Sequence, residues 1–210
     1  LRLSFCGWPQ TTGASFINHM VADKVVAVPE QASREFTEKL IMLPESYLPA
    51  DHANLVGSVL TRPRATAEDV NHTSSFAFGS LSSFQKLDSS IFDVWANILR
   101  RSSKRSVLRL MRYALHDLAE PRLREELAAR GIHPSRLEFT PMAPWLDHVW
   151  RKTHLDVMLD SFVKSGHSVV QDGLWAQVPS ISLAGNRMEA RAGATALRAV
   201  RLSAYTEALS

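Results

Sequence analysis

Short apolar runs alternate with amphipathic stretches from Phe76 to the end of the chain, at the spacing of strand–helix–strand units in a parallel sheet. This alternation predicts strands at residues 75–79, 106–112, 137–140, 156–159 and 180–183. It predicts helices at residues 88–99, 120–130, 168–176 and 188–200. Asp88 is placed to cap the first of these helices, and Gly131 to end the second. We therefore predict an α/β fold, a Rossmann-like parallel sheet with flanking helices.

Residues 1–70 follow a different pattern. They hold a loop rich in Gly and Thr at 7–13, a mixed strand at 24–28 and a long loop with Pro44, Pro49 and Pro63. We interpret this stretch as the end of one unit followed by a linker, and residues 71–210 as a second, Rossmann-like unit. Structured-looking sequence begins at once at Leu1, so we expect the natural protein to extend further upstream.

Composition narrows the classes of protein that fit. With 210 residues, 45% hydrophobic and 21% charged, the chain can bury a core of ordinary size. Its apolar stretches are only a few residues long, so we predict no membrane span. The single cysteine, Cys6, allows no internal disulfide and fits a reducing compartment, so we expect a cytoplasmic or nuclear protein. The net charge of +3 favours a pyrophosphate ligand but is too small to indicate a nucleic-acid partner.

Loops that follow the predicted strands are the candidate ligand sites, because open parallel sheets bind ligands at the carboxyl ends of their strands. Residues 78–86 lead from a strand through a small polar loop to Lys86, which could neutralise a phosphate or stand exposed at a helix start. Residues 139–151 end with His148 and Arg151, which lie side by side on one helical face. This pair could frame a base or belong to an ordinary surface.

The loop after the strand at 156–159 has the composition that best suits a nucleotide diphosphate. Gly166 allows a close backbone turn, and Ser168 stands where a helix N-terminus offers hydroxyl and N–H donors to a phosphate. Asp172 follows about one helical turn later, where it suits a ribose. A capped helix with an ordinary surface aspartate explains the same spacing equally well.

Several motifs in order resemble one known family. They are Gly-Trp-Pro-Gln-Thr-Thr-Gly-Ala at 7–14, Asp-His-Ala-Asn at 51–54, Val-Trp-Ala-Asn-Ile-Leu at 94–99, Ala-Pro with His148 and Arg151, and Gly-His-Ser with Asp172 and Leu-Trp-Ala at 174–176. Together they are similar to the protein O-GlcNAc transferases, glycosyltransferases of the GT-B fold. The resemblance makes residues 71–210 the C-terminal, nucleotide-sugar-binding lobe, and residues 1–70 the end of the N-terminal catalytic lobe with a linker.

The resemblance implies an enzyme that moves GlcNAc from UDP-GlcNAc to Ser/Thr hydroxyls of proteins, with inversion and without a metal or other cofactor. It makes Lys86 and His167 the catalytic residues, with Lys86 stabilising the UDP leaving group. Asp172 would accept hydrogen bonds from the ribose. The other implied donor-binding residues surround the diphosphate (Ser83, Gly166, Ser168 and Val169), the uracil (Ala143, His148 and Arg151) and the sugar (Gly7, Pro9 and Thr11).

Three positions depart from the family pattern. Val169 stands in place of a Thr, Ser83 in place of a Gln, and Trp145 in place of a Lys that contacts ribose. His19 matches neither of the histidines proposed to assist catalysis in the family. That catalytic half and the tetratricopeptide array that recruits acceptor proteins lie outside this sequence, so we expect the isolated chain to be inactive.

Two alternative functions remain open. One is a catalytically impaired module that binds UDP-sugar without turnover, which the departures at Ser83, Trp145 and Val169 favour. The other is a GDP-fucose-dependent protein O-fucosyltransferase of the Spindly type, which shares the Phe-Gly-Ser start at Phe78. That group tends to carry a Gly-Thr-Thr-Thr run where this chain has Gly-His-Ser-Val at 166–169, so the GlcNAc enzymes are the better match.

Overall fold

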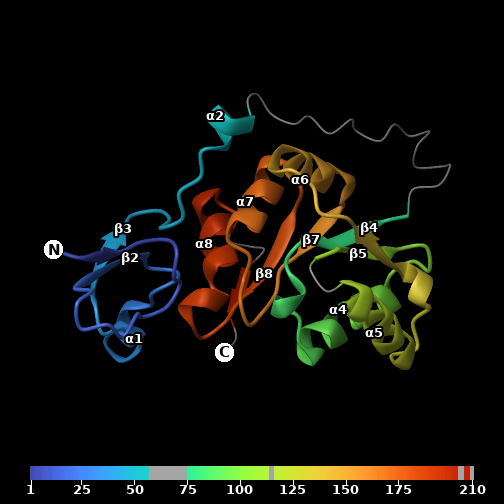
Figure 1. Cartoon of the computed structure of the whole chain (residues 1–210), viewed down its shortest axis with the longest axis horizontal. Coiled ribbons are helices and arrows are strands. Elements are labelled where there is room, and N and C mark those ends of the chain that lie inside the picture. Colours follow the sequence, from blue (N-terminus) through green and yellow to red (C-terminus); the bar gives the residue numbers. More distant parts are fainter. Residues whose placement is uncertain (57–74, 114–115, 203–205, 209–210) are drawn as a thin grey trace. The chain divides into compact units, whose positions relative to one another are not determined.

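The structure is a computed structural model that describes residues 1–56, 75–113, 116–202 and 206–208 (Figure 1). It confirms the predicted α/β class, because the described strand pairs of both sheets run parallel and helices connect most of the strands. The chain folds into two compact units. The first unit comprises Leu1–Asp51, Asp160–Gln171 and Ile181–Ser210, and the second comprises His52–Leu159 and Asp172–Ser180.

The larger sheet has the strand order β6-β5-β4-β7-β8-β9. Its strands are β4 (Ala77–Ser80), β5 (Val107–Met111), β6 (Leu137–Thr140), β7 (Val157–Leu159), β8 (Ser180–Ala184) and β9 (Thr206–Ala208). In its register, Phe78 pairs with Leu108 on one side and with Val157 on the other. The five predicted strands are β4 to β8, each with ends within two residues of the prediction. The hydrophobic pattern did not predict β9.

The helices of the second unit include two long ones, α4 (Ser89–Arg101) and α5 (His116–Ala129). The side chain of Asp88 caps α4 as predicted, accepting from the N–H of Ile91 at 2.9 Å. α5 begins four residues before the predicted start, and Gly131 follows it with a φ of 73°, the left-handed conformation expected of a helix terminator. The shorter helices are α2 (His52–Val56), η1 (Phe84–Lys86), η2 (Pro134–Arg136), α6 (Trp145–Arg151) and η3 (Lys152–His154), and α7 (Ser168–Trp175) ends in this unit.

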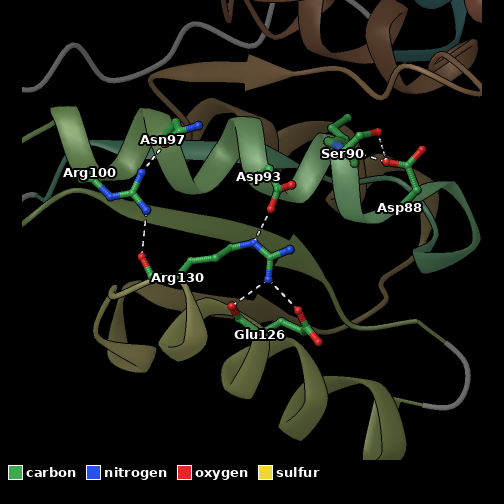
Figure 2. A network of polar contacts seen from close by, with 8 residues as sticks. Asp88, Ser90, Asp93, Asn97, Arg100, Glu126 and Arg130 are labelled. Carbon is green, nitrogen blue, oxygen red and sulfur yellow. Dashed lines mark hydrogen bonds and ion pairs between the residues drawn. The ribbon is translucent and has the colours of Figure 1, made fainter.

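A polar network joins α4 to α5 (Figure 2). Arg130 donates to Asp93 of α4 at 2.6 Å and to Glu126 of α5 at 2.5 Å. Arg100 reaches back to the backbone carbonyl of Arg130 at 2.8 Å and to the side chain of Asn97. Beneath this surface, α4 buries an apolar stripe of Ile91, Phe92, Trp95, Ala96 and Leu99, and it packs on β5.

The first unit contains a smaller sheet of β1 (Leu3–Ser4), β2 (His19–Asp23) and β3 (Lys39–Leu43) in that order. Its helices are α1 (Pro29–Glu35), η4 (Met188–Ala190) and α8 (Ala192–Ala199), and α7 begins in this unit. The helix predicted at 188–200 is therefore divided into η4 and α8.

The strand predicted at 24–28 is wrong, and β2 ends where it was expected to begin. The carboxylate of Asp23 accepts from the N–H groups of Val25 at 2.8 Å and Val26 at 3.1 Å, which turns the chain. Pro29 then starts α1. Val26 and Ala27 are fully buried in this turn, so their apolar character reflects burial rather than a strand.

The predicted division at residue 70 stays a prediction, because residues 57–74, with Pro63, lie outside the described part of the chain. The compact units group the C-terminal segment with the N-terminal residues instead of separating the two at that point. Among the described residues, no helix combines the length and the apolar character needed to cross a bilayer.

Candidate functional site

A buried carboxylate organises the loop between β7 and α7 in the first unit. Asp160 accepts hydrogen bonds from the N–H groups of Ser161 at 2.8 Å and Gly166 at 2.6 Å, from the Ser182 hydroxyl at 2.7 Å, and from the Ser165 hydroxyl. Burial raises the pKa of Asp160, and these four hydrogen bonds oppose that rise. Asp160 thereby fixes both ends of the turn that enters α7.

Neighbouring side chains leave no space for a side chain at Gly166 in this turn. A Cβ atom at this position would lie 2.9 Å from Val170 Cγ2 and 3.3 Å from Asp160 Oδ1, which is too close for a side chain. The close backbone turn expected at Gly166 is therefore present. The glycines with positive φ in the described residues are Gly13 and Gly131, so Gly166 needs no left-handed backbone.

α7 begins immediately after this turn, and its first residues face solvent more than its middle. The His167 carbonyl accepts from the N–H of Val170 at 3.2 Å, Ser168 is exposed and Val169 is half-buried. The N–H groups and the helix dipole at such an end favour an anion. The buried ring of Tyr47, which the sequence did not single out, lies edge-on to the His167 imidazole with ring centroids 6.5 Å apart.

The Gly/Thr loop of the first unit is held by Glu38, a residue that was not among the predicted site residues. Glu38 accepts from the Thr11 hydroxyl at 2.8 Å and from the Thr12 N–H at 2.7 Å, as well as from the Thr12 hydroxyl. Burial raises the pKa of Glu38, but the hydrogen bonds from Thr12 and Thr11 outweigh burial and lower it to about 2. Within this loop Pro9 is buried and Gly7 is exposed.

A cavity of about 240 Å³ adjoins this loop, within the first unit. The buried carboxylate of Glu189 accepts from the Gln10 side-chain amide at 2.6 Å on its wall. The lining is mixed, with apolar, amide, hydroxyl and charged groups: Gln10, Thr11, Glu35, Phe36, Arg187, Met188 and Glu189. Such a lining suits a small polar molecule with one apolar face.

In the second unit, Lys86 lies at the end of η1, directly after β4. Its N–H donates to the Ser83 carbonyl at 3.1 Å, so the two predicted residues share one helical turn. Both side chains are half-buried. The short 3₁₀ helix therefore places the lysine at the carboxyl end of a central strand, where open parallel sheets bind their ligands.

The predicted base-binding residues surround α6 in the same unit. Arg151 donates to the Thr140 hydroxyl at 3.3 Å and to the Pro141 carbonyl, which fixes its guanidinium at the end of β6. Ala143 and His148 are half-buried. Burial lowers the pKa of His148 to about 4, and the nearby Lys152 contributes to that lowering, so the imidazole is neutral at pH 7.

Asp172 is buried in the second unit with two partners that the sequence did not predict. Its Oδ1 lies 2.8 Å from His52 Nε2, and its Oδ2 accepts from Lys152 Nζ at 3.1 Å. Because Asp172 is only 2% exposed, the alternative of an ordinary surface aspartate is wrong. Its predicted contact with a ribose stays a prediction.

The predicted site residues divide between the two units. The first unit holds Gly7, Pro9, Thr11, Gly166, His167, Ser168 and Val169, and the second holds Ser83, Lys86, Ala143, His148, Arg151 and Asp172. In the first unit, Thr11 and Gly166 donate hydrogen bonds to the buried carboxylates of Glu38 and Asp160. In the second unit, Lys86 and Arg151 are the last residues of η1 and α6.

Comparison with known families decides the classification. Residues 1–78 and 72–206 match the family model described as Glycosyl transferase family 41. The chain belongs to this family. The match confirms the resemblance drawn from the motifs and extends over nearly the whole chain.

Two curated relatives of this family 41 chain come from plants. It is 34% identical over 194 residues to the probable UDP-N-acetylglucosamine–peptide N-acetylglucosaminyltransferase SEC of Arabidopsis thaliana, covering 91% of this chain and 19% of that protein. It is 26% identical over 204 residues to the protein of the same description named SPINDLY from Oryza sativa subsp. japonica, covering 96% and 21%. The chain thus spans about a fifth of the length of these relatives.

A solved family structure shares the fold. The O-GlcNAc transferase from Thermobaculum terrenum, in a mutant form, aligns with a TM-score of 0.83 at 24% sequence identity. The alignment covers 99% of this chain and 38% of that one. This likeness confirms the predicted fold class for the family 41 chain, a parallel α/β architecture of the GT-B type.

Proposed function

We propose that this chain provides the donor-binding region of an inverting transferase that moves GlcNAc from UDP-GlcNAc to Ser/Thr hydroxyls of proteins. The observation that supports this best is the turn at Gly166, which Asp160 pins at the start of α7. A helix start fixed in this way has little freedom to lose when an anion binds. The relative at 34% identity, described as a probable transferase for UDP-N-acetylglucosamine, supports the choice of donor.

The diphosphate is the part of the donor that this geometry suits. Backbone N–H groups at Ser168 and Val169 would bind phosphate oxygens, with the α7 dipole adding to the attraction. Val169 has no hydroxyl, so it would offer only its N–H. Lys86 and His167 would stabilise the negative charge that develops on UDP as its bond to the sugar breaks. We therefore assign the leaving-group role to these two side chains.

The nucleoside would bind through residues of the second unit. A neutral His148 imidazole can stack on uracil or exchange hydrogen bonds with it, whereas a charged one would first have to be desolvated. The Ala143 backbone and Arg151 would frame the base, and Asp172 would accept from the ribose. The loop with Gly7, Pro9 and Thr11 would approach the sugar, with Glu38 holding Thr11 in place.

The transfer itself needs one bond to form and one to break. The acceptor hydroxyl oxygen would bond to the anomeric carbon from the face opposite UDP, while the bond from that carbon to the diphosphate breaks and UDP leaves with the electron pair. The hydroxyl proton would be released to water, so the products are the glycosylated side chain, UDP and one proton. We propose that no metal is required. Chelation by EDTA should then leave the dissociation constant for UDP unchanged, and a loss of binding that Mg²⁺ restores would contradict this part of the proposal.

Calorimetry of this chain with UDP and with GDP tests the donor assignment. We expect UDP to bind and GDP to bind at least about tenfold more weakly, because a pocket built for a pyrimidine excludes the larger guanine. Equal binding of the two, or no binding of UDP, would overturn the proposal. Preferred binding of GDP would point to the fucosyl donor, and UDP binding without transfer in a longer family protein would point to an impaired module.

Replacing Lys86 tests the diphosphate site directly. Lys86→Met should weaken UDP binding by about tenfold or more, since one charge-assisted hydrogen bond contributes roughly 1.5–3 kcal/mol. Lys104→Met is the matched control, because Lys104 is an exposed lysine of the same unit outside the site. An unchanged dissociation constant in Lys86→Met would remove Lys86 from the site.

The protein acceptors and the compartment also belong to this proposal. We propose that acceptor proteins dock through a helical repeat region in a longer chain, and that the protein acts in the cytoplasm or nucleus. The resemblance to the protein O-GlcNAc transferases supports both. Imaging of the tagged full-length protein checks the compartment, and an extracellular or luminal signal would contradict it.

A further inference from the structure

Lys152 is a buried lysine at the junction of α6 and η3, and nothing in the family motifs points to it. Its side chain is 0% exposed. The ammonium donates to Asp172 Oδ2 at 3.1 Å and to the His148 carbonyl at 3.3 Å. Asp172 in turn is shared with His52, whose Nε2 lies 2.8 Å from Oδ1. These three side chains form one buried polar cluster within the second unit, which we call the Asp172 cluster.

Several charged and titratable groups face this cluster from the elements packed around it. Asp172 comes from α7, His52 from α2, and His148 and Arg151 from α6. The His52 ring also contacts two tryptophan rings, Trp145 and Trp175, with centroids 5.7 and 5.6 Å away. The cluster is thus flanked at His52 by two tryptophan rings and adjoins the predicted base-binding residue His148.

Stability alone does not explain why an ammonium is buried here. Burial lowers the pKa of Lys152 to about 8, and the ion pair with Asp172 offsets only part of that effect. The folded protein therefore holds the charged lysine less favourably than water does. Buried ion pairs of this kind are often no more stabilising than apolar side chains of similar size. A role in orienting Asp172 accounts for the lysine better.

The Asp172 carboxylate keeps unused acceptor capacity beside its partners among the described residues. Each carboxylate oxygen offers about two lone-pair directions, and His52 and Lys152 each occupy one oxygen once. With both oxygens held, the carboxylate plane cannot rotate. We propose that Lys152 is a positioning residue for the nucleotide, which fixes the orientation of the Asp172 carboxylate so that its remaining lone pairs accept the ribose hydroxyls. This inference rests on the proposed function.

Binding of UDP and of 2′,3′-dideoxy-UDP, which lacks both ribose hydroxyls, tests the inference by calorimetry. The unaltered chain should bind UDP about tenfold or more tightly than the dideoxy form. Lys152→Met should weaken UDP binding by about tenfold and change dideoxy-UDP binding by less than about twofold. Lys104→Met, which removes an exposed lysine of the same unit, should change neither.

The outcomes separate this inference from the proposed function. Failure of the unaltered chain to bind UDP would overturn both. Binding of UDP by the unaltered chain, with equal losses for UDP and dideoxy-UDP in Lys152→Met, would keep the proposed function and overturn the positioning role, because a general structural defect weakens both ligands alike.

A second variant keeps the test decisive if Lys152→Met does not fold because its buried Asp172 carboxylate has lost the ammonium partner. The double variant Lys152→Met/Asp172→Asn leaves no charge unpaired in the pair. If Lys152 acts through Asp172, this double variant should bind UDP as well as Asp172→Asn does, within about twofold. A further loss of about tenfold relative to Asp172→Asn would contradict the inference.

Discussion

Single residues contribute to how the stability of this protein responds to pH, and Lys152 contributes to the alkaline response. Its pKa is about 8 in the folded protein, below the ordinary value of 10.5 that applies to the unfolded chain. Between these two values the unfolded state binds more protons than the folded state, so the free energy of unfolding rises with pH. The penalty for burying the ammonium is present below about pH 8 and is relieved above it.

Urea unfolding at pH 7.5 and pH 9.5 checks this response. We expect the Lys152 contribution to raise the free energy of unfolding by about 1–2 kcal/mol over that interval, and the rise to be absent in Lys152→Met. Lys104→Met should keep the rise, since Lys104 is exposed. A rise of equal size in Lys152→Met would show that other groups cause it.

The distance along the sequence between Asp172 and its partners explains why Asp172 was predicted and its partners were not. Asp172 was predicted because it lies one helical turn after a Gly-His-Ser motif. Its partners were not, because Lys152 lies 20 residues away and His52 lies 120 residues away. Both sit in motifs or patterns that give no sign of contact with Asp172. Such long-range pairing needs the fold itself, so the spacing could not separate a buried aspartate from a surface one.

At the scale of elements, the start of α7 depends on one carboxylate. In Asp160→Asn an amide NH₂ replaces one acceptor oxygen, so it faces either the N–H groups of Ser161 and Gly166 or the hydroxyls of Ser165 and Ser182. We expect a loss of about 1–3 kcal/mol in the free energy of unfolding and about tenfold weaker UDP binding, because the turn no longer holds one shape. Denaturant titration and calorimetry measure the two effects.

Asp93→Asn is the control for this change. Asp93 is also an aspartate with a hydrogen-bonded partner, Arg130, but its side chain is 58% exposed on α4. It should lose little stability and no UDP affinity. Tight UDP binding by Asp160→Asn would contradict the dependence of the site on this turn.

The cap of α4 is a second prediction at this scale. Asp88→Ala removes the acceptor for the Ile91 N–H and should lower the free energy of unfolding by about 1 kcal/mol. Asp88→Asn should retain most of the capping, because asparagine is also a favoured N-cap residue. Urea midpoints measure both. Equal losses in the two variants would show that the charge of Asp88 matters more than its hydrogen bond.

Elements with strong local signals were predicted well, and those without were not. α4 has a capping aspartate and a continuous apolar stripe, and the predicted strands are bounded by turn residues. The prediction of a strand at 24–28 was wrong because the valines there lie in a turn that Asp23 stabilises. β9 pairs with β8 in parallel over three residues, too few to show a period in the sequence.

At the scale of the whole molecule, net charge shapes how an anionic ligand is attracted. The chain carries a formal charge of +3, and the proposed site contains Lys86 and Arg151. UDP binding should therefore weaken several-fold between about 0.05 and 0.5 M NaCl, because salt screens these charges. Uridine carries no charge, so its binding should not respond. Equal salt dependence of UDP and uridine would place the effect elsewhere.

Sequence and structure agree on the class of fold, and the predicted division at residue 70 stays a prediction. Parallel strands joined by helices could be predicted from the spacing of hydrophobic residues, because that spacing depends only on residues close together in the sequence. The grouping of Asp160–Gln171 and Ile181–Ser210 with the N-terminal residues follows from packing between segments far apart in the chain, which no period reveals. The predicted site residues are therefore shared between two units that the sequence alone did not delimit.

The buried network around Asp160 constrains how this region can change in evolution. Gly193 N donates to the Ser165 hydroxyl at 2.6 Å, and that hydroxyl donates to Asp160. A Cβ atom at Gly193 would collide with the Asp160 carboxylate and with the Ser182 hydroxyl. A larger residue at 193 thus requires a smaller side chain without a carboxylate at 160. We expect these positions to covary among family 41 proteins, as a linked set that is inherited or replaced together.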